Sequence, residues 1–249
     1  MCPLISIIIP ARNDAVALQH TLDRLQQLTG IAGVQILVAA SGDLGSTERA
    51  VAGRAQLIRP ARSSRSALMN TAADVASGEI LFFLHADSFP PPDALERINS
   101  LLQNPKILGG AFEHRFVETS WSLRAISWIN RRRYRLTRNY YGDQGIFVRA
   151  SVFRNLGGYR DLGLMEDLDL SQRLKRSGRT VLIRSPLVTS GRRFIDRGPW
   201  RTFAFIVWLL FLYTLRLDTQ RYARRWQGPP DGVPGTRWIR SDGESNEVR

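Results

Sequence analysis

The sequence has a single cysteine, only two lysines and no long run of apolar residues. One cysteine, Cys2, excludes a disulfide framework and any metal site built from several thiolates, and it fits a reducing compartment such as the cytoplasm. No stretch reaches the roughly 18 apolar residues that a membrane-spanning helix needs. The first apolar run, Leu4–Ile9, ends at Pro10 and is too short for a secretory signal. We therefore expect a cytoplasmic protein, and its 249 residues are enough to bury a sizeable core.

Because lysine is nearly absent, arginine supplies almost all of the positive charge. The chain has 35 Lys+Arg against 22 Asp+Glu, a net charge of +13. Such a charge attracts nucleic acid, anionic lipid or phosphorylated small molecules, although a genome rich in G and C also enriches arginine. The sequence contains no zinc-finger spacing and no RNA-binding aromatic pattern, so we expect no nucleic-acid partner. The arginines gather at 131–138, 192–201 and 216–225.

Short apolar runs alternate with helical patterns through the first half of the chain. The spacing predicts strands at Leu4–Ile9, Gln35–Ala40, Gln56–Arg59 and Ile80–Leu84, and helices at Ala15–Leu28, Ser64–Ala76 and from Pro90 to about Gln103. This alternation is typical of an α/β protein whose mostly parallel sheet is flanked by helices. Ligands bind such sheets beyond the carboxyl ends of the strands. The expected binding segments are therefore Pro10–Asp14, Ser41–Thr47 and His85–Ser88.

The second half of the chain is less regular. Its pattern predicts strands at Ala111–Val117, Ile146–Arg149 and Val181–Ile183, a helix or long loop at Trp121–Arg138, and helices at Asp167–Arg176 and Pro199–Leu217. We expect one domain over residues 1–226. From 227 to 249 the sequence is rich in Pro and Gly and then polar, which predicts a disordered tail.

An acidic residue follows the fourth predicted strand. The segment from Leu81 to Asp87 reads Leu-Phe-Phe-Leu-His-Ala-Asp, an apolar strand with a carboxylate after its end. At the mouth of a parallel sheet, Mg²⁺ or Mn²⁺ can be held by one or two carboxylates together with substrate phosphates. Such an ion would neutralise a departing diphosphate. Alternatively, Asp87 caps the helix that starts after Pro90.

Three acids lie close together at Glu166, Asp167 and Asp169. Acids near the start of a helix are favoured by the helix dipole, which is one explanation for them. Their number exceeds what a single cap requires. The second explanation is that one of them acts as a general base beside a sugar acceptor.

Three further segments have both a structural and a functional interpretation. Gly142 and Gly145 frame a polar tip that is either a hairpin turn or a place where sugar hydroxyls meet Asp143 and Gln144. Arg65 and Asn70 follow a helix start that is either capped by Ser63 or Ser64 or binds an anion.

The paired arginines Arg192 and Arg193 form either a solvated basic loop or a clamp on a diphosphate or lipid phosphate.

Taken together, the order and spacing of these segments resemble the family 2 glycosyltransferases, which have the GT-A fold. Ser6–Asp14 is similar to the opening of that family, Leu84–Ser88 to its metal-binding acid motif, and Glu166-Asp167 to its catalytic pair. The segments Tyr141–Arg149 and Thr189–Arg193 more closely resemble a bacterial subgroup, the radical-SAM/selenodomain-associated transferases, some of which are described as arsenosugar-biosynthesis glycosyltransferases. The resemblance covers about residues 4–217.

The resemblance implies that a hexosyltransferase-like enzyme moves a sugar, with inversion, from a nucleotide-diphosphate sugar to an unknown acceptor hydroxyl. It implies that Mn²⁺ or Mg²⁺ is coordinated by Asp87, and that Asp167, with Glu166 beside it, takes the acceptor's proton. Residues 1–110 would bind the donor and 111–198 the acceptor. The donor residues implied are Pro10, Ala11, Asp14, Ser41, Gly42, Asp43, Arg65, Asn70, His85, Ala86 and Asp87, and the acceptor residues are Gly142, Asp143, Gln144, Arg192 and Arg193.

The segment after the second strand departs from the family pattern. Acids usually stand there in an order like Asp-Gly-Gly-Ser-x-Asp, but Ala40 and Gly45 occupy the acid positions. Losing such an acid removes a charge-assisted hydrogen bond worth about 1.5–3 kcal/mol. The donor is then unusual, weakly bound or held by Asp43. Alternatively, the protein is a catalytically silent relative that binds a sugar nucleotide or a lipid phosphate. A nucleotidyltransferase would need a glycine-rich first loop, and Pro10–Asp14 has no glycine.

The segment Phe203–Tyr213 is wholly apolar. As a helix it measures about 16 Å, which is too short for a hydrocarbon core of roughly 30 Å. Arginines flank it, and Trp200 and Trp208 suit a membrane interface. Three roles remain open: a helix lying on the anionic inner face of the cell membrane, a contact in a homodimer, or a core helix packed on the sheet.

Overall fold

The computed structural model describes residues 4–222 and 226. Its described part contains an eight-stranded sheet in the order β3-β2-β1-β4-β7-β6-β8-β5. The strands are β1 (Ile5–Arg12), β2 (Gln35–Ser41), β3 (Gln56–Ile58), β4 (Ile80–Phe83), β5 (Ser88–Phe89), β6 (Ile107–Phe116), β7 (Ile146–Arg149) and β8 (Arg179–Thr189). The predicted α/β fold with a mostly parallel sheet is confirmed, whereas the antiparallel pairings of β7 and β5 were not predicted.

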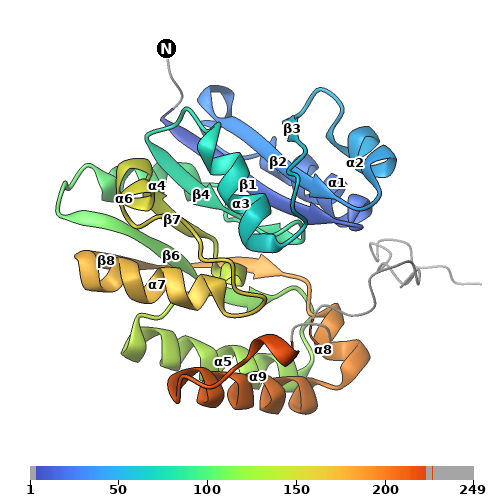
Figure 1. Cartoon of the computed structure of the whole chain (residues 1–249), viewed down its shortest axis with the longest axis vertical. Helices are drawn as coiled ribbons and strands as arrows, with labels where there is room; N and C mark the ends of the chain where they lie inside the picture. Colours follow the sequence, from blue (N-terminus) through green and yellow to red (C-terminus); the bar gives the residue numbers. More distant parts are fainter. Residues whose placement is uncertain (1–3, 223–225, 227–249) are drawn as a thin grey trace, which may run out of the picture.

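Helices flank the sheet on both faces (Figure 1). They are α1 (Ala15–Leu25), α2 (Leu44–Val51), α3 (Arg65–Asp74), α4 (Ala94–Leu102), α5 (Trp121–Thr137), α6 (Ala150–Asn155), α7 (Glu166–Ser177), α8 (Arg192–Arg197) and α9 (Pro199–Thr214). Helices α5 and α9 contact each other and form a separate layer below α7 in Figure 1. This layer becomes one wall of the cavity described below.

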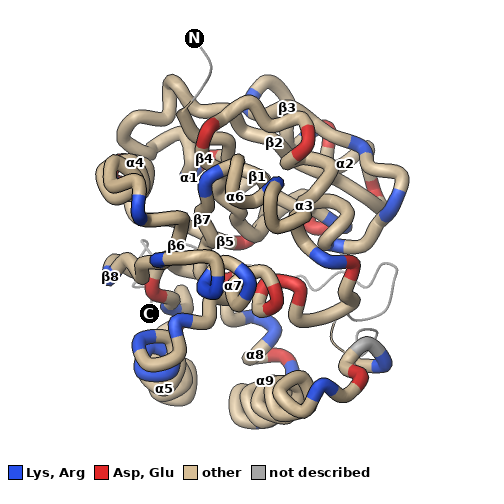
Figure 2. The backbone as a smooth tube through the Cα atoms, turned by 60° about the vertical axis from the view of Figure 1, so that its left-hand side comes forward, with Lys and Arg blue, Asp and Glu red and all other residues tan. Residues whose placement is uncertain are grey.

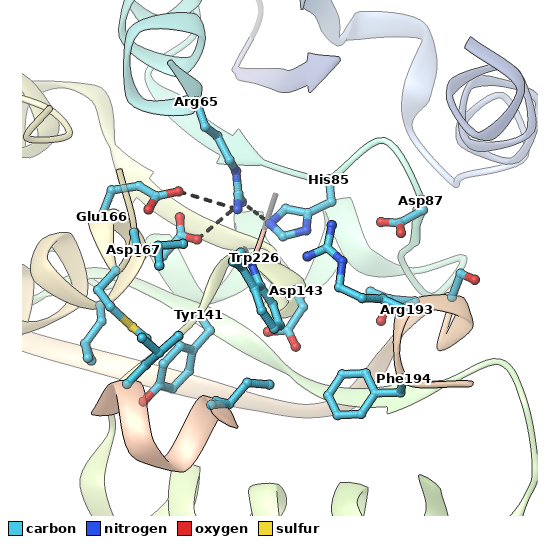
Figure 3. Close-up of a pocket in the computed structure, with 18 of the residues that line it drawn as sticks. Arg65, His85, Asp87, Tyr141, Asp143, Glu166, Asp167, Arg193, Phe194 and Trp226 are labelled. Atoms are coloured by element: carbon cyan, nitrogen blue, oxygen red, sulfur yellow. Dashed lines mark hydrogen bonds and ion pairs between the residues drawn. The ribbon is translucent and has the colours of Figure 1, made fainter. Parts of the chain in front are cut away.

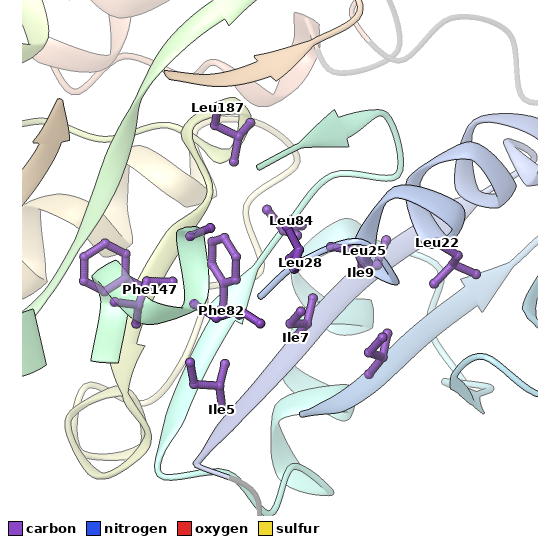
Figure 4. Close-up of a cluster of buried hydrophobic side chains, with 14 of the residues drawn as sticks. Ile5, Ile7, Ile9, Leu22, Leu25, Leu28, Phe82, Leu84, Phe147 and Leu187 are labelled. Atoms are coloured by element: carbon purple, nitrogen blue, oxygen red, sulfur yellow. The ribbon is translucent and has the colours of Figure 1, made fainter. Parts of the chain in front are cut away.

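The central strands are mostly apolar at successive positions because both of their faces are covered. Along β1, Ile7 and Ile9 belong to the cluster that packs under α1 and α4, whereas Ile8 belongs to the cluster under α3, α6 and α7. Figure 4 shows the first cluster, with Leu22 and Leu25 of α1 above the strand. A sheet buried on both faces needs apolar side chains at successive positions, which explains the run Ile7–Ile9 in β1.

Strand β1 runs through Pro10 and ends only at Arg12, which corrects the prediction that Pro10–Asp14 is a loop. Strand β4 pairs with β1 only as far as Ile8, whose carbonyl accepts the last hydrogen bond, from the Leu84 N–H at 2.9 Å. The backbone nitrogen of Pro10, two residues further along β1, faces the same side of the strand as that carbonyl but lies beyond the end of β4. Because no β4 residue lies opposite it, the N–H that proline lacks leaves no hydrogen bond between the strands unmade.

Two segments interpreted as loops are helical. The segment after β2 forms α2, and the Asp43 side chain caps it by accepting a hydrogen bond from the Ser46 N–H at 3.2 Å. The basic segment after β8 forms the short helix α8. Ser64 caps α3 by accepting from the Ala67 N–H at 3.3 Å, so the capping interpretation holds there. Asp87 does not cap α4, which begins after Asp93.

Within residues 4–222 and 226, none of the helices combines the length and the apolar character that crossing a membrane would require. Helix α9 buries Leu209 and Leu212 against the rest of the protein, while Trp208 and Phe211 remain exposed. The predicted disordered tail, 227–249, lies outside the described residues.

Candidate active site

A cavity of about 380 Å³ opens beyond the carboxyl ends of β1 and β4 (Figure 3). Its walls come from the loop after β4, the turn before β7, the start of α7, helix α8, and the facing sides of α5 and α9. Asp87 and Asp167, which are far apart in the sequence, both line it. The carboxylates that sequence analysis singled out therefore face a common space.

Asp87 lies in a group of mixed charges on one side of the cavity. Burial raises the pKa of its carboxyl, the nearby Asp14 raises it further, and Arg192 and Arg193 oppose the rise. Asp14 is itself paired with Arg192, whose Nη2 lies 2.7 Å from Asp14 Oδ2. Burial lowers the pKa of Arg193. The group offers two half-buried carboxylates and two guanidiniums, a combination suited to a phosphate and its counter-ion.

The acid pair occupies the first turn of α7 on the other side of the cavity. Glu166 is 5% exposed and Asp167 is 8% exposed. Burial raises the pKa of Glu166 to about 7, with the charge of Asp167 adding to the rise and Arg65 opposing it. Burial also raises the pKa of Asp167. A carboxylate with a raised pKa can accept a proton near neutral pH, as a general base must.

Arg65, on the first turn of α3, holds both acids. Its Nη1 lies 3.5 Å from Glu166 Oε1 and its Nη2 lies 3.2 Å from Asp167 Oδ2. The same guanidinium contacts His85 Nε2. Burial, and then the charge of Arg65, lowers the pKa of His85 well below its usual value, so this imidazole is neutral and Nε2 accepts from the guanidinium. The arginine thus fixes the orientation of the acid pair.

Two structural details explain why the chain can bring these groups together. A Cβ on Gly142 would lie 2.5 Å from Asp167 Oδ2, and closer still to Arg65 and His85, so only glycine leaves room for the cluster. Met165, at φ +67°, adopts the left-handed conformation just before α7. That conformation costs a non-glycine residue about 1–2 kcal/mol, and it turns the chain into the helix that presents the acid pair.

Similarity to known proteins agrees with this geometry. A family model described as glycosyl transferase family 2 matches residues 6–156. The chain belongs to glycosyl transferase family 2. No curated protein shows significant similarity to the sequence.

Solved structures share the fold. One is the mannosyltransferase PcManGT from Pyrobaculum calidifontis in complex with GDP-Man and Mn²⁺, with a TM-score of 0.68, 20% identity, and coverage of 90% of this chain and 67% of that one. Another is S. aureus TarS, with a TM-score of 0.54, 12% identity, and coverage of 75% of this chain and 35% of that one. At these identities the likeness shows the GT-A fold.

Most of the residues proposed from the glycosyltransferase resemblance line the cavity. On the donor side these are Pro10, Asp14, Arg65, His85, Ala86 and Asp87. The others are Gly142, Asp143, Glu166, Asp167, Arg192 and Arg193. Of these, Arg65 lies against the acid pair, so the anions that it contacts in the structure are the carboxylates of Glu166 and Asp167.

Six proposed residues do not line the cavity: Ala11, Ser41, Gly42, Asp43, Asn70 and Gln144. The two carboxamides belong to the scaffold instead. Asn70 bridges the backbone of Tyr159, accepting from its N–H and donating to its carbonyl, both at 2.8 Å. Gln144 is fully buried, donates to the Phe112 carbonyl at 2.9 Å and accepts from the Tyr141 N–H at 3.0 Å. We therefore remove both from the proposed site.

The loop after β2 also has a scaffold role. Asn13 Oδ1 accepts a hydrogen bond from the Asp43 N–H at 2.8 Å, and a Cβ on Gly42, whose φ is +84°, would clash with the Asn13 side chain. Ala40 is 2% exposed inside β2. No acid from this loop lines the cavity described here.

Sequence reasoning missed the apolar wall of the cavity, which α5 and α9 provide. The residues missed include Asn130 and Tyr134 of α5, and Phe203, Ile206 and Leu209 of α9. Spacings of three and four place each set on one helix face. That signal was present in the sequence, but it did not reveal that the two faces meet each other across a cavity.

Proposed function

We propose that this glycosyltransferase moves a sugar, with inversion, from a nucleotide-diphosphate sugar to an acceptor hydroxyl. One observation carries the proposal: Asp87 in the loop after β4 and the Glu166-Asp167 pair at the start of α7 line one cavity and lie on opposite sides of it in Figure 3. Inversion requires the base and the leaving group on opposite faces of the sugar. A hexose placed between these carboxylates has its diphosphate beside Asp87 and its acceptor beside Asp167.

The chemical step needs one proton acceptor from the protein. The acceptor hydroxyl gives its proton to Asp167 while its oxygen bonds to the anomeric carbon. The bond from that carbon to the diphosphate breaks, and the diphosphate leaves with the electron pair. Arg65 holds Asp167 at 3.2 Å and limits the rise of its pKa, which keeps the carboxylate available as a base.

The residues around Asp87 fit a divalent ion that is shared with the donor. Within the described residues, no three His, Cys, Asp or Glu side chains approach closely enough to hold a metal unaided. Mg²⁺ and Mn²⁺ are commonly bound by one or two carboxylates plus substrate phosphates, and Asp87, with Asp14 close by, offers that arrangement. When bound, the ion would neutralise charge on the departing diphosphate. Arg192 and Arg193 would contact its oxygens.

Two finer proposals follow from the same residues. We assign 1–226 to one domain, because residues from both predicted halves line the cavity. We also place the chain near the radical-SAM/selenodomain-associated subgroup, on the resemblance of Tyr141–Arg149 and Thr189–Arg193.

A second candidate function rests on the loop after β2. Because Ala40 is buried and Asp43 caps α2, this loop contributes no acid to the cavity. A protein that binds a sugar nucleotide or lipid phosphate without turning it over would have the same arrangement. The two functions differ in whether bound donor is consumed.

A donor screen tests both candidates. The purified chain is mixed with a panel of nucleotide-diphosphate sugars, with and without Mn²⁺, and both melting temperature and released nucleoside diphosphate are measured. We expect one donor to stabilise the protein and to be hydrolysed slowly only when metal is present. Stabilisation without release would favour the binding protein, and the absence of both would contradict the transferase.

We also propose that α5 and α9 rest on an anionic membrane, at the inner face of the cell membrane. Trp121, Trp128 and Leu136 of α5 are 73%, 54% and 85% exposed. Trp208 and Phe211 of α9 are also exposed. The rings of Trp121 and Trp200 lie 5.8 Å apart, so the two exposed stripes join into one surface. We call this surface the tryptophan face.

Positive charge is interleaved with the tryptophan face. Arg124 and Arg132 fall on the same exposed stripe of α5, and the Arg132 guanidinium lies 4.6 Å from the Trp128 ring centroid. Neither α5 nor α9 contains an acidic residue, and α5 shows only positive charge in Figure 2. In a homodimer formed through this face, the arginines of the two copies would lie opposite one another and repel. An anionic lipid surface would instead attract them. The charge pattern therefore favours a membrane over a homodimer.

Vesicle sedimentation tests the membrane proposal. At low salt we expect binding to phosphatidylglycerol-containing vesicles and not to phosphatidylcholine alone. The double variant Arg124→Gln/Arg132→Gln should bind roughly fivefold more weakly for each arginine removed, since each is worth about 1 kcal/mol. Arg49→Gln/Arg62→Gln, which removes two exposed arginines elsewhere, is the charge-matched control. Dimers in solution without vesicle binding would contradict the proposal.

A further inference from the structure

The cavity changes chemical character from one side to the other. Around Asp87 it is lined by charged groups, whereas toward α5 and α9 it is lined by Phe116, Phe194, Phe203, Ile206 and Leu209. The proposed sugar and diphosphate need only the charged side. The apolar side is therefore available to another part of a substrate.

Helix α9 separates this apolar wall from the tryptophan face. Phe203, Ile206 and Leu209 recur every third residue and point into the cavity, while Trp208 and Phe211 lie on the exposed side. Phe203 and Ile206 remain half-buried, and Phe203 packs against the apolar cluster of Phe116, Leu123 and Ile126. A ligand that covered them with hydrocarbon would gain about 0.8 kcal/mol for each buried methylene.

Polar atoms without partners lie at the border of the apolar wall. Among the described residues, Asn130 Oδ1, Asp143 Oδ1 and Asp167 Oδ1 are buried and accept no hydrogen bond. All three side chains line the cavity, and Asn130 is only 7% exposed. An unsatisfied buried acceptor is costly, so a bound group with several hydroxyls would gain by donating to these oxygens.

A donor for the same group is also present. Arg133 Nε is buried without a hydrogen bond, and its guanidinium lies 4.8 Å from the Tyr141 ring centroid. Arg133 lines the cavity beside Tyr134 and Tyr141. A hydroxyl group both donates and accepts hydrogen bonds, and so it can satisfy an oxygen such as Asn130 Oδ1 and this N–H together.

We propose that the acceptor is an amphiphilic polyol, with a hydroxylated head near Asn130, Asp143 and Asp167 and a hydrocarbon body against Phe203 and Ile206. This inference rests on the proposed transferase function, since it identifies the class of acceptor for the same cavity. The hydroxyl that reacts is the one that reaches Asp167. Because α9 carries both the apolar wall and part of the tryptophan face, an acceptor of this kind is reached from a lipid surface.

Binding of matched glycosides tests the inference without requiring turnover. Octyl and methyl β-glycosides of glucose, galactose and mannose are titrated calorimetrically into the full chain, below micelle formation. For at least one sugar we expect the octyl form to bind at least tenfold more tightly, because each buried methylene is worth about fourfold in affinity. Equal weak binding of both members of every pair would overturn the inference.

Two variants of α9 distinguish the cavity from the exposed surface. Ile206→Gln places a polar side chain in the apolar wall and should abolish the octyl preference while leaving methyl glycoside binding within about twofold. Ala204→Gln introduces the same residue at an exposed position outside the cavity and should keep the preference. If Ala204→Gln loses the octyl preference and Ile206→Gln keeps it, the octyl glycosides adsorb to the outer surface of α9, and the inference is overturned.

The transferase function itself is read out separately as donor hydrolysis by water. If hydrolysis occurs without any octyl preference, only the acceptor inference fails. If the octyl preference occurs without hydrolysis of any donor, the cavity binds amphiphiles and the proposed transferase function fails.

Discussion

Asp167→Asn should reduce the rate of sugar transfer by roughly 10²–10⁴-fold, the usual contribution of a positioned general base. The substitution keeps the shape of the side chain and removes its ability to accept a proton. Donor binding should change little, because Asp167 lies across the cavity from Asp87 and the arginines beside it. Initial rates of nucleoside diphosphate release and donor affinity by thermal shift measure the two effects.

The pH dependence gives the matched control for this prediction. A base must be deprotonated to act, and burial raises the pKa of Asp167, so the wild-type rate should rise with pH at values above the usual range of a carboxyl group. This rise should be lost in Asp167→Asn. Glu166→Gln should keep more activity, because it removes only the neighbour. If Glu166→Gln loses more activity than Asp167→Asn, then Glu166 is the general base and Asp167 is its neighbour.

Asp87→Asn should lower transfer by roughly 10²–10³-fold, the size of effect seen when one group that stabilises developing charge is removed. The Asn oxygen is neutral and holds a divalent ion poorly, and the change leaves the Arg192 and Arg193 charges less balanced. The half-saturating concentration of Mn²⁺ should rise more than that of any other reaction component. A titration of rate against Mn²⁺ at fixed donor concentration measures this shift.

Asp93→Asn is the control for the loss of a carboxylate. Asp93 precedes α4, has a side chain that is 41% exposed, pairs with Arg97 at 2.6 Å and does not line the cavity. Its variant should keep the wild-type rate and metal dependence. An Asp87→Asn variant with an unchanged Mn²⁺ requirement would remove Asp87 from the proposed metal site.

The sequence indicated the chemistry of the site because the acidic residues lie at the ends of predicted strands and helices. An apolar strand followed by Asp87, and a helix that opens with Glu166-Asp167, are local patterns set by burial and by the helix dipole. The same patterns predicted the strands and helices of the parallel half closely, except for α2, which was interpreted as a loop. The direction of β7 was not predictable in this way, since strand direction depends on how the connecting segments cross the sheet.

Individual polar residues were harder to assign from the sequence. Asn70 and Gln144 are the residue types that bind sugars, but the same hydrogen-bonding groups serve equally well to bridge a buried backbone, and that is how the fold uses them. Arg65 was predicted to follow a helix start that binds an anion, and in the structure its guanidinium contacts the two carboxylates of the acid pair. A side chain's partner depends on what lies opposite it, which local sequence does not record.

The sequence by itself determined the alternation of strands and helices, the positions of the acids at their ends and the excess of arginine on α5. Only the tertiary structure decided that Asp87 and Asp167 face one cavity, and that α5 and α9 line its apolar side while exposing tryptophans on the other. Local patterns follow from short-range sterics and from which faces are buried. The meeting of distant segments follows from the packing of the whole chain, which no single window of sequence contains.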